Sequence, residues 1–417
     1  MLESDRPAGT LPRAQDSPSE EDREDPLSVL LLTPRWARDG GVGAHVEASA
    51  SALVQAGHDV TVVAAHIVSE TRIPGVTLTR NPKLCRTEES LQTRLGDVLA
   101  AQPDIVHLHQ IDDPQIAACM RARAPVVISA HGYTACTSGV HYYRPGHESH
   151  RPHAPGCVPN LIFRGCAHMR NPLRLPGMYR NATRGLEALH MADHVVSYST
   201  AVDRHLADNG VGQRSIVPYF PTLPVSPRGE EDGSRRVLFA GRIVASKGLA
   251  VLIRAAREVE AEFVVCGDGA RRAAMERLAA RLDVADRFSF AGWLGREAFA
   301  RELAHASLAV VPSLWPEPFG LVGIEAFAAA RPAVASATGG IGDWLQDGVG
   351  GLLVPPGNPR ALARALEGLL CDPEGQRRMG AAGKRIVEER FSAERHIEAL
   401  LSCYRSARSR WESAGPS

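Results

Sequence analysis

The chain of 417 residues lacks three features that would point to common classes of protein. No run of about 18 apolar residues occurs, so no transmembrane helix is predicted. No charge excess occurs either, because 47 Lys and Arg residues balance 47 Asp and Glu residues. This balance argues against nucleic acid or an anionic membrane as the main partner. Eight cysteines are too few for a disulfide scaffold of this length, so we expect a globular protein of the cytoplasm.

The first 26 residues are polar, contain prolines and are rich in Asp and Glu. They have neither the basic start nor the apolar centre of a signal peptide. We therefore predict a disordered leader over residues 1–26. The remaining residues are enough for two domains with sizeable cores.

Short apolar runs typical of buried parallel strands alternate with helical patterns along the rest of the chain. A linker rich in Pro, Gly and charge interrupts this alternation at residues 218–234. The pattern predicts an α/β protein with two Rossmann-like, doubly wound domains that face each other across a cleft. The domains are expected at 27–222 and 234–390, with a terminal helix and tail at 391–417. Strands are expected at 27–33, 59–64, 104–109, 125–131, 194–198, 236–240, 262–266, 287–290, 307–311 and 332–336.

Two cations follow the first strand of the second half. Arg242 comes directly after the strand, and Lys247 precedes the next helix. A helix N-terminus favours anions, and two cations add charge-assisted hydrogen bonds, so the pair is suited to phosphate. Two surface cations at a helix start are the plainer alternative.

Two carboxylates lie eight residues apart in the segment Glu317-Pro-Phe-Gly-Leu-Val-Gly-Ile-Glu325. Glu317 stands in a loop between two prolines, and Glu325 lies in a helix that is otherwise nearly all apolar. An ionised carboxylate accepts two hydrogen bonds from paired hydroxyls, as sugars and ribose offer them. The alternative for Glu325 is a structural ion pair. A glycosidase pair of carboxylates is disfavoured, because it needs no cationic clamp for a diphosphate.

The set formed by Arg242, Lys247, Glu317, Glu325 and the segment Gly339-Gly340-Ile341 resembles the signature of family 4 (group 1) glycosyltransferases of GT-B fold. The resemblance covers nearly the whole chain from about residue 27. It implies a retaining enzyme that takes a sugar from a nucleotide donor.

The resemblance also implies residue roles. Glu317 would hold sugar hydroxyls, Glu325 the ribose, and Arg242 with Lys247 the departing diphosphate. The backbone amides of Phe319, Gly320 and Leu321 would assist. No Asp-x-Asp occurs in the chain, which favours a mechanism without a metal cofactor, since cations and a helix N-terminus can stabilise the leaving charge.

The N-terminal half is expected to supply the acceptor side. Gly41, Val42 and Gly43 precede a helix and would let the backbone approach phosphate or acceptor; a mere tight turn is the alternative. His109 and His131 end two strands, so both are expected to face the cleft. His131 matches a family histidine close to the donor sugar. Each histidine could instead be a structural residue with satisfied hydrogen bonds.

The sequence indicates less clearly which residues would recognise the nucleotide base of the donor. Gly267 follows a strand and allows a close approach of the backbone, and Trp293 occupies the next turn, where family members contact the base. Trp293 could stack on the base or simply pack against the protein. UDP, GDP and ADP donors all remain compatible with these residues.

A long segment at 132–175 carries Cys136, Cys157, Cys166 and His168. Three thiols and an imidazole are the right number and kind of ligands for a zinc site, although their spacing along the sequence is not that of a typical zinc site. A structural zinc, unliganded thiols in an acceptor loop and a redox cluster are the alternatives. The other five cysteines are expected in core or helix positions.

These features predict a metal-independent, retaining hexosyltransferase that uses a nucleotide sugar and an acceptor hydroxyl and needs no cofactor. The alternatives are another GT-B enzyme, such as a nucleotide-sugar epimerase or a phosphorylase, and a non-catalytic subunit that binds nucleotide sugars. Peripheral contact with a membrane is compatible with the Arg-rich segment at 164–184.

Overall fold

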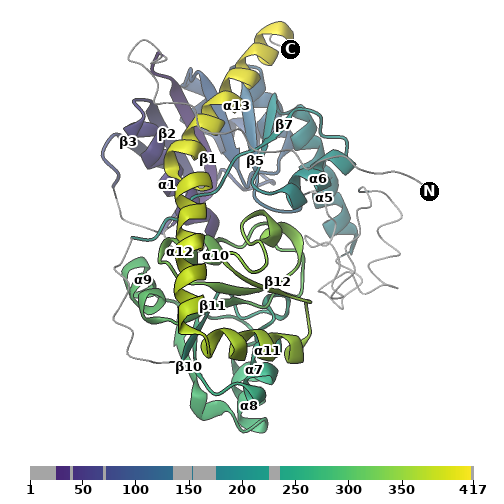
Figure 1. Ribbon diagram of the computed structural model, residues 1–417. Coiled ribbons are helices and arrows are strands. Elements are labelled where there is room, and N and C mark those ends of the chain that lie inside the picture. The colour runs from purple at the N-terminus through teal and green to yellow at the C-terminus, as the bar shows by residue number, and fades with distance from the viewer. Residues whose placement is uncertain are drawn as a thin grey trace, which may run out of the picture.

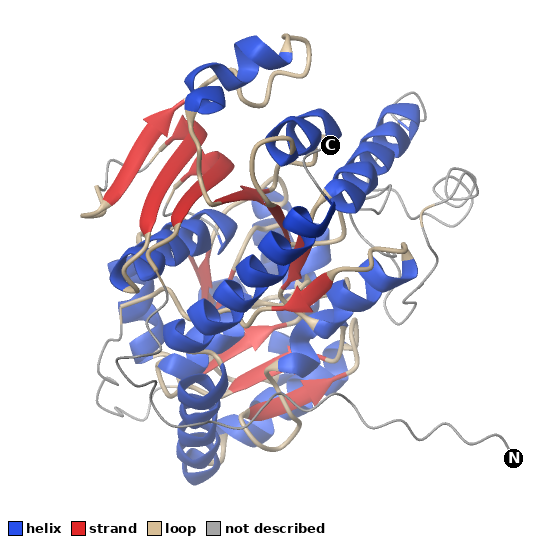
Figure 2. Ribbon diagram, turned by 90° about the horizontal axis from the view of Figure 1, so that it is seen from above, coloured by secondary structure: helices blue, strands red, loops and turns tan. Residues whose placement is uncertain are grey.

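The computed structural model describes residues 25–37, 41–68, 72–134, 153, 175–224 and 235–414. Two parallel sheets lie one above the other in Figure 1, and helices cover their faces (Figure 2). The N-terminal domain contains β1 (Ser28–Trp36), α1 (Gly41–Gln55), β2 (Asp59–Ile67), β3 (Val76–Arg80), α2 (Leu91–Leu95), η2 (Gly96–Ala100), β4 (Ile105–His109), α3 (Pro114–Arg121), β5 (Val126–Ala130), α5 (Leu175–Met191), β6 (His194–Ser197), α6 (Thr200–Asp208) and β7 (Arg214–Ile216).

The C-terminal domain repeats this alternation and ends in three long helices. Its elements are β8 (Arg236–Ala240), η4 (Ala245–Lys247), α7 (Leu249–Ala255), η5 (Ala256–Glu258), β9 (Glu262–Cys266), α8 (Arg272–Arg281), η6 (Ala285–Arg287), β10 (Phe288–Gly292), α9 (Arg296–His305), β11 (Leu308–Val311), α10 (Leu321–Ala328), β12 (Ala333–Ser336), η7 (Gly339–Asp343), β13 (Gly351–Val354), α11 (Pro359–Leu370), α12 (Pro373–Arg390) and α13 (Ala393–Ala414).

Both sheets have the doubly wound strand order. The order is β3-β2-β1-β4-β5-β6-β7 in the first sheet and β10-β9-β8-β11-β12-β13 in the second. The paired strands of both sheets run parallel. The order reverses between β1 and β4 and again between β8 and β11, which is where such sheets bind ligands. The predicted fold class is therefore confirmed.

Each first strand is buried on both faces, which explains why it reads as a continuous apolar run. Val29 and Leu31 of β1 pack into one core cluster, and Leu30 and Leu32 pack into another on the opposite face. In β8, Val237 and Phe239 likewise pack into one core cluster, and Leu238 packs into another. Helices on both faces are needed to cover such strands.

Three strands were not predicted, and their composition explains why. β3 is an edge strand with the sequence VTLTR and little burial, β7 has only three residues, and β13 starts at a glycine. None of them shows the apolar run of a central strand. The expected core or helix position of the cysteines is wrong for Cys85, which lies exposed in a turn, whereas Cys119 lies in α3, Cys266 and Cys403 are buried, and Cys371 is the exposed C-cap residue of α11.

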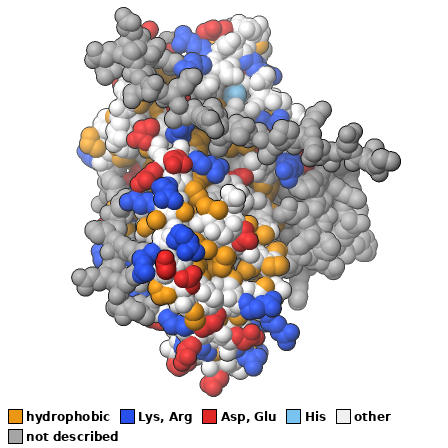
Figure 3. Space-filling model, in the orientation of Figure 1, with side chains coloured by type: hydrophobic (Ala, Val, Ile, Leu, Met, Phe, Trp, Pro, Cys, Tyr) orange, Lys and Arg blue, Asp and Glu red, His pale blue; other side chains and the backbone are white. Residues whose placement is uncertain are grey.

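The surface carries no dominant field of one sign on the face seen in Figure 3, where basic and acidic side chains are interspersed with apolar ones. This agrees with the equal numbers of basic and acidic residues in the sequence. Within the described ranges, no helix combines the length and the apolar character needed to cross a membrane.

The last helix returns to the N-terminal domain. In Figure 1, α12 lies along the C-terminal domain and α13 continues across the other sheet. Tyr404 of α13 bonds His107 Nδ1 at 2.9 Å, and Trp411 Nε1 donates to the Arg121 carbonyl at 2.6 Å. His396, near the start of the helix, donates from Nδ1 to the Pro218 carbonyl at 2.8 Å. The helix predicted at 391–417 thus connects the two domains.

A second contact joins the domains directly. Asp343 of η7 accepts hydrogen bonds from the backbone N–H and the hydroxyl of Thr200, at 2.8 and 2.5 Å. Gly340 lies so close to Ser199 that a Cβ atom at this glycine would be 2.8 Å from the Ser199 Cβ. The second glycine of the Gly339-Gly340 motif therefore permits close approach of the domains.

Five buried histidines, the last of them part of α13 itself, cluster where this helix docks: His45, His107, His109, His131 and His396. Burial lowers the pKa of each imidazole, to about 3 for His109 and about 4 for His396. Hydrogen bonds engage several of them; the Ser49 hydroxyl, for example, lies 3.1 Å from His396 Nε2. The folded protein therefore keeps these rings neutral.

This burial predicts acid lability. An imidazole in the unfolded chain has a pKa near 6.5, so below that pH the unfolded state binds more protons than the folded state. The free energy of unfolding should thus be fully present above about pH 6.5 and fall towards pH 4, by up to about 1.4 kcal/mol per pH unit for each ring. Urea unfolding over this range measures the slope.

His396→Gln should make that slope shallower, because one group that protonates on unfolding is removed. His305→Gln is the matched control, since His305 lies at the exposed end of α9. An equal slope in wild type and His396→Gln would contradict the assignment.

Gly248 places Lys247 next to the end of β11. It has φ +72°, and a Cβ atom there would overlap the Pro312 carbonyl. We predict that Gly248→Ala lowers the free energy of unfolding by about 2–4 kcal/mol, as measured by urea denaturation. Gly348→Ala is the control, because Gly348 has φ +78° with open space around it and should cost only about 1 kcal/mol. Equal losses would show that the contact with Pro312 is unimportant.

Candidate active site

A cavity of about 880 Å³ lies between the two domains. The N-terminal domain lines it with residues that follow β1, β4 and β5, and the C-terminal domain with residues that follow β8 and β11. These are the carboxyl ends of the strands next to the switch points in both sheets. Both halves of the chain thus contribute to one candidate site.

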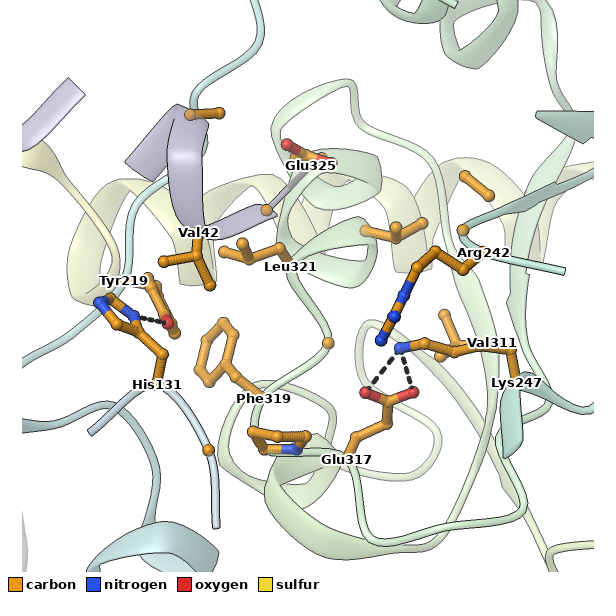
Figure 4. A pocket seen from close by; sticks show the side chains of 18 of the residues that line it. Val42, His131, Tyr219, Arg242, Lys247, Val311, Glu317, Phe319, Leu321 and Glu325 are labelled. Carbon is orange, nitrogen blue, oxygen red and sulfur yellow. Dashed lines mark hydrogen bonds and ion pairs between the residues drawn. The ribbon is translucent and has the colours of Figure 1, made fainter. Parts of the chain in front are cut away.

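An ion pair occupies the C-terminal side of the cavity. Lys247 Nζ lies 2.7 and 2.9 Å from the two carboxylate oxygens of Glu317. Figure 4 shows the pair, with the guanidinium of Arg242 directed towards it. The Glu317 side chain is only 3% exposed and the Lys247 side chain 24%. The pair brings together the two residues that the sequence assigned to sugar and to phosphate.

Neighbouring groups fix the Glu317 carboxylate. The Ser313 hydroxyl donates to Oε1, and the Gly340 N–H donates to the Glu317 carbonyl at 2.7 Å. The ring of Trp315 lies 5.6 Å from Lys247 Nζ, within reach of a cation–π contact. A carboxylate held this tightly presents a fixed acceptor to a ligand hydroxyl.

Arg242 supplies a second positive charge to the same wall. Its side chain is exposed and lines the cavity, and no ion pair engages it within the described parts of the chain. The guanidinium can therefore meet an anion that enters beside Lys247.

Glu325 lines the cavity from the second turn of α10, and Leu321 lies between it and Glu317 in Figure 4. Burial raises the pKa of Glu325 to about 7, against the opposing effects of Arg296 and a hydrogen bond from Thr222. A carboxyl group accepts hydrogen bonds from hydroxyl groups when ionised and can also donate one when protonated, so Glu325 can bind hydroxyl groups in either state.

The start of α10 also faces the cavity. Phe319, Gly320 and Leu321 line it, and Gly320 is the N-cap residue of the helix. The first N–H groups of a helix have no acceptor within the helix and favour an anion. This geometry fits the predicted contribution of backbone amides.

His131 lines the cavity from the end of β5, but its two ring nitrogens are engaged. Nδ1 lies 2.8 Å from the Tyr219 hydroxyl, and Nε2 lies 3.1 Å from His109 Nδ1. The dashed line in Figure 4 marks the first of these bonds. Proton transfer by this ring would require the hydrogen bonds to rearrange, so a contact through the ring face or the backbone is favoured.

Three of the predicted site residues lie behind the cavity wall. His109 is buried and packs behind His131, contrary to the expectation that it faces the cleft. A Cβ atom at Gly43 would lie 2.6 Å from the Ala37 carbonyl oxygen, and one at Gly267 would overlap the Gly241 backbone. These two glycines are explained by packing of the backbone.

Gly41 and Val42 line the cavity, but they form the first turn of α1 and not a loop before it. Gly41 allows this turn to approach α10, since a Cβ there would be 3.0 Å from Leu321 Cδ1. Trp293 lines the cavity with an exposed side chain. The proposed zinc ligands Cys136, Cys157, Cys166 and His168 lie outside the described residues.

The cavity wall contains residues that the sequence analysis missed. Gln110 and Asp112 follow β4, Thr134 follows β5, and Tyr219 and Thr222 follow β7. The signal was available for the first three, because they come just after strands whose carboxyl ends face the cleft. Tyr219 and Thr222 lie in the segment interpreted as a linker, which shows no such signal.

Comparisons with known proteins agree with this architecture. Residues 39–218 match the family model "Glycosyltransferase Family 4", and residues 226–386 match the model "Glycosyl transferases group 1". A curated relative, alpha-D-kanosaminyltransferase from Streptomyces kanamyceticus, is 33% identical over 174 residues, which are 40% of this chain and 45% of the relative. The matched segments span 34–47% of the length of three such relatives.

Solved structures match over nearly the whole chain. Sucrose-phosphate synthase from Thermosynechococcus elongatus has a TM-score of 0.67 at 23% identity and covers 92% of this chain and 99% of its own. Anabaena HepE, solved in complex with UDP and glucose, has a TM-score of 0.66 at 18% identity, covering 90% and 99%. At these identities the likeness shows the GT-B fold. The two family models, which match different halves of the chain, both describe glycosyltransferases.

Proposed function

We propose that the protein is a retaining glycosyltransferase that moves a sugar from a nucleotide-diphosphate donor to an acceptor hydroxyl without a metal ion. The observation that carries the proposal is the cluster of Lys247, Glu317 and Arg242 in the cavity between the domains. A location in the cytoplasm is an expectation from the sequence alone.

The cluster suits a diphosphate that bears a sugar. An ammonium group donates three hydrogen bonds, and Glu317 accepts two from Lys247, which leaves one for a phosphate oxygen. Arg242 and the start of α10 would bind the remaining charge. The sugar lies next to that phosphate, and Glu317, which contacts Lys247, would accept a hydrogen bond from one of its hydroxyl groups. Glu325, further along α10, would then hold the ribose.

The reaction would proceed on one face of the sugar. The bond between the anomeric carbon and the phosphate oxygen breaks while the acceptor oxygen bonds to that carbon from the same face. The departing phosphate takes the acceptor proton, so charge and atoms balance. Lys247 and Arg242 would stabilise the leaving charge in the role that a divalent ion has elsewhere.

The nucleotide proposed first is UDP, because the similar protein HepE was solved in complex with UDP and glucose and with UDP-glucose. The same donor site would serve an epimerase or a nucleotide-sugar-binding subunit. An epimerase would convert the donor with no acceptor, and a binding subunit would bind it without turnover.

The first test removes the ion pair. Lys247→Ala and Glu317→Gln should each lower kcat by about a hundredfold or more, since each removes a group that stabilises the transition state. Release of the nucleoside diphosphate from the donor measures the rate. Lys384→Ala is the control, because Lys384 forms an exposed pair with Glu388 on α12. Full activity in either site variant would refute the assignment.

A second test concerns the metal. We predict that treatment with EDTA leaves turnover of the donor unchanged, and that added Mg²⁺ or Mn²⁺ does not raise it, because side-chain cations neutralise the diphosphate. Loss of activity in EDTA with recovery on addition of a divalent ion would disprove metal independence.

A further inference from the structure

Two adjacent carboxylates follow β4, and their surroundings differ. Asp113 pairs with Arg94 at 2.7 Å and with Arg184 at 3.1 Å, and it caps α3 by accepting the Gln115 N–H. Asp112 lines the cavity, and within the described ranges no hydrogen bond or ion pair engages its carboxylate. One carboxylate thus has a structural role that the other lacks.

The Asp112 carboxylate is available to a ligand. The residue is exposed and lines the cavity. The surrounding residues still desolvate the carboxyl group enough to raise its pKa to about 6. A carboxylate that faces a cavity and has no described partner is a candidate for contact with a ligand.

Helix α5 packs against the segment that contains Asp112. A Cβ atom at Gly185 of α5 would lie 3.4 Å from the Asp112 Cβ and 2.8 Å from Thr134 Cγ2. Helix α5 therefore packs directly against both residues and holds them side by side. Gln110, two residues earlier, has a φ of +54° and also lines the cavity. Asp112, Thr134 and Gln110 form one polar wall.

This wall belongs to the N-terminal domain, whereas the groups proposed for the donor all belong to the C-terminal domain. Of the described residues that line the cavity, Asp112 is the one carboxylate from the N-terminal domain. Two aromatic rings complete this side: Tyr133, and Trp315 from the opposite domain, lie with ring centroids 6.3 Å apart. Hydrogen-bond acceptors beside aromatic rings suit a ring that carries hydroxyl groups.

We propose that Asp112 binds the acceptor and selects an unphosphorylated polyol, such as a sugar or cyclitol ring, by accepting hydrogen bonds from its hydroxyl groups. Thr134 and Gln110 supply further polar contacts. The proposal rests on the proposed sugar transfer for its use of the word acceptor. A phosphate ester is disfavoured at this wall, because its charge would meet the Asp112 carboxylate.

The test measures binding of polyols to the full chain by saturation-transfer NMR, with and without saturating UDP. The probes are glucose, N-acetylglucosamine and myo-inositol, each beside a phosphate monoester. Wild type should bind at least one free polyol. Asp112→Asn should weaken that polyol about tenfold or more, because a charged acceptor is lost, and should leave UDP binding unchanged. Asp286→Asn, an exposed position in η6, is the control.

Three results would overturn the proposal. They are absence of binding by all three free polyols, equal affinity in wild type and Asp112→Asn, and tighter binding of the phosphate esters than of the free polyols. Failure of wild type to bind UDP would instead count against the proposed transferase function. In that case, the measurement of polyol binding without UDP would still show whether Asp112→Asn weakens the binding of the polyol.

Discussion

The ion pair between Lys247 and Glu317 is the interaction on which the candidate site depends. Glu317 is almost completely buried, so its charge would be costly without Lys247. The two residues come from different turns, one after β8 and the other after β11. Their contact requires the close approach of Gly248 to Pro312 and the hydrogen bond from Gly340 to the Glu317 backbone. The glycines of the sequence motif are thus explained by the geometry of this pair.

The charge of this cluster favours an anionic ligand. Arg242 and Lys247 carry two positive charges, and Glu317 carries one negative charge, which leaves a net charge of +1 on these three residues. An anion entering beside Arg242 can bind without breaking the ion pair, because Lys247 keeps one free donor. The buried Glu317 carboxylate therefore keeps its partner both with and without a ligand.

The sequence predicted the fold, and the cavity residues of the C-terminal domain, better than it predicted the cavity residues of the N-terminal domain. Central strands such as β1 and β8 read clearly because both of their faces are buried, whereas the edge strand β3 and the short β7 carry no such pattern. Arg242, Lys247, Glu317 and Glu325 stand in two short motifs of the C-terminal half. The wall from the N-terminal domain depends on side-chain direction at strand ends, which the sequence does not show. His109 points inwards and bonds His131, while Asp112, three residues later, faces the cavity.

The two walls of the cavity belong to different domains, so their distance depends on the contacts between those domains. Asp343 with Thr200 forms one such contact, and α13 forms another through His396 and Tyr404. Tyr404 bonds His107, which bonds Ser129, a residue of the cavity wall. A change in the docking of α13 would therefore alter the N-terminal wall of the cavity while leaving the Lys247–Glu317 pair intact, since that pair lies wholly within the C-terminal domain. The C-terminal wall is thus set by local turns, and the N-terminal wall by the packing of the whole molecule.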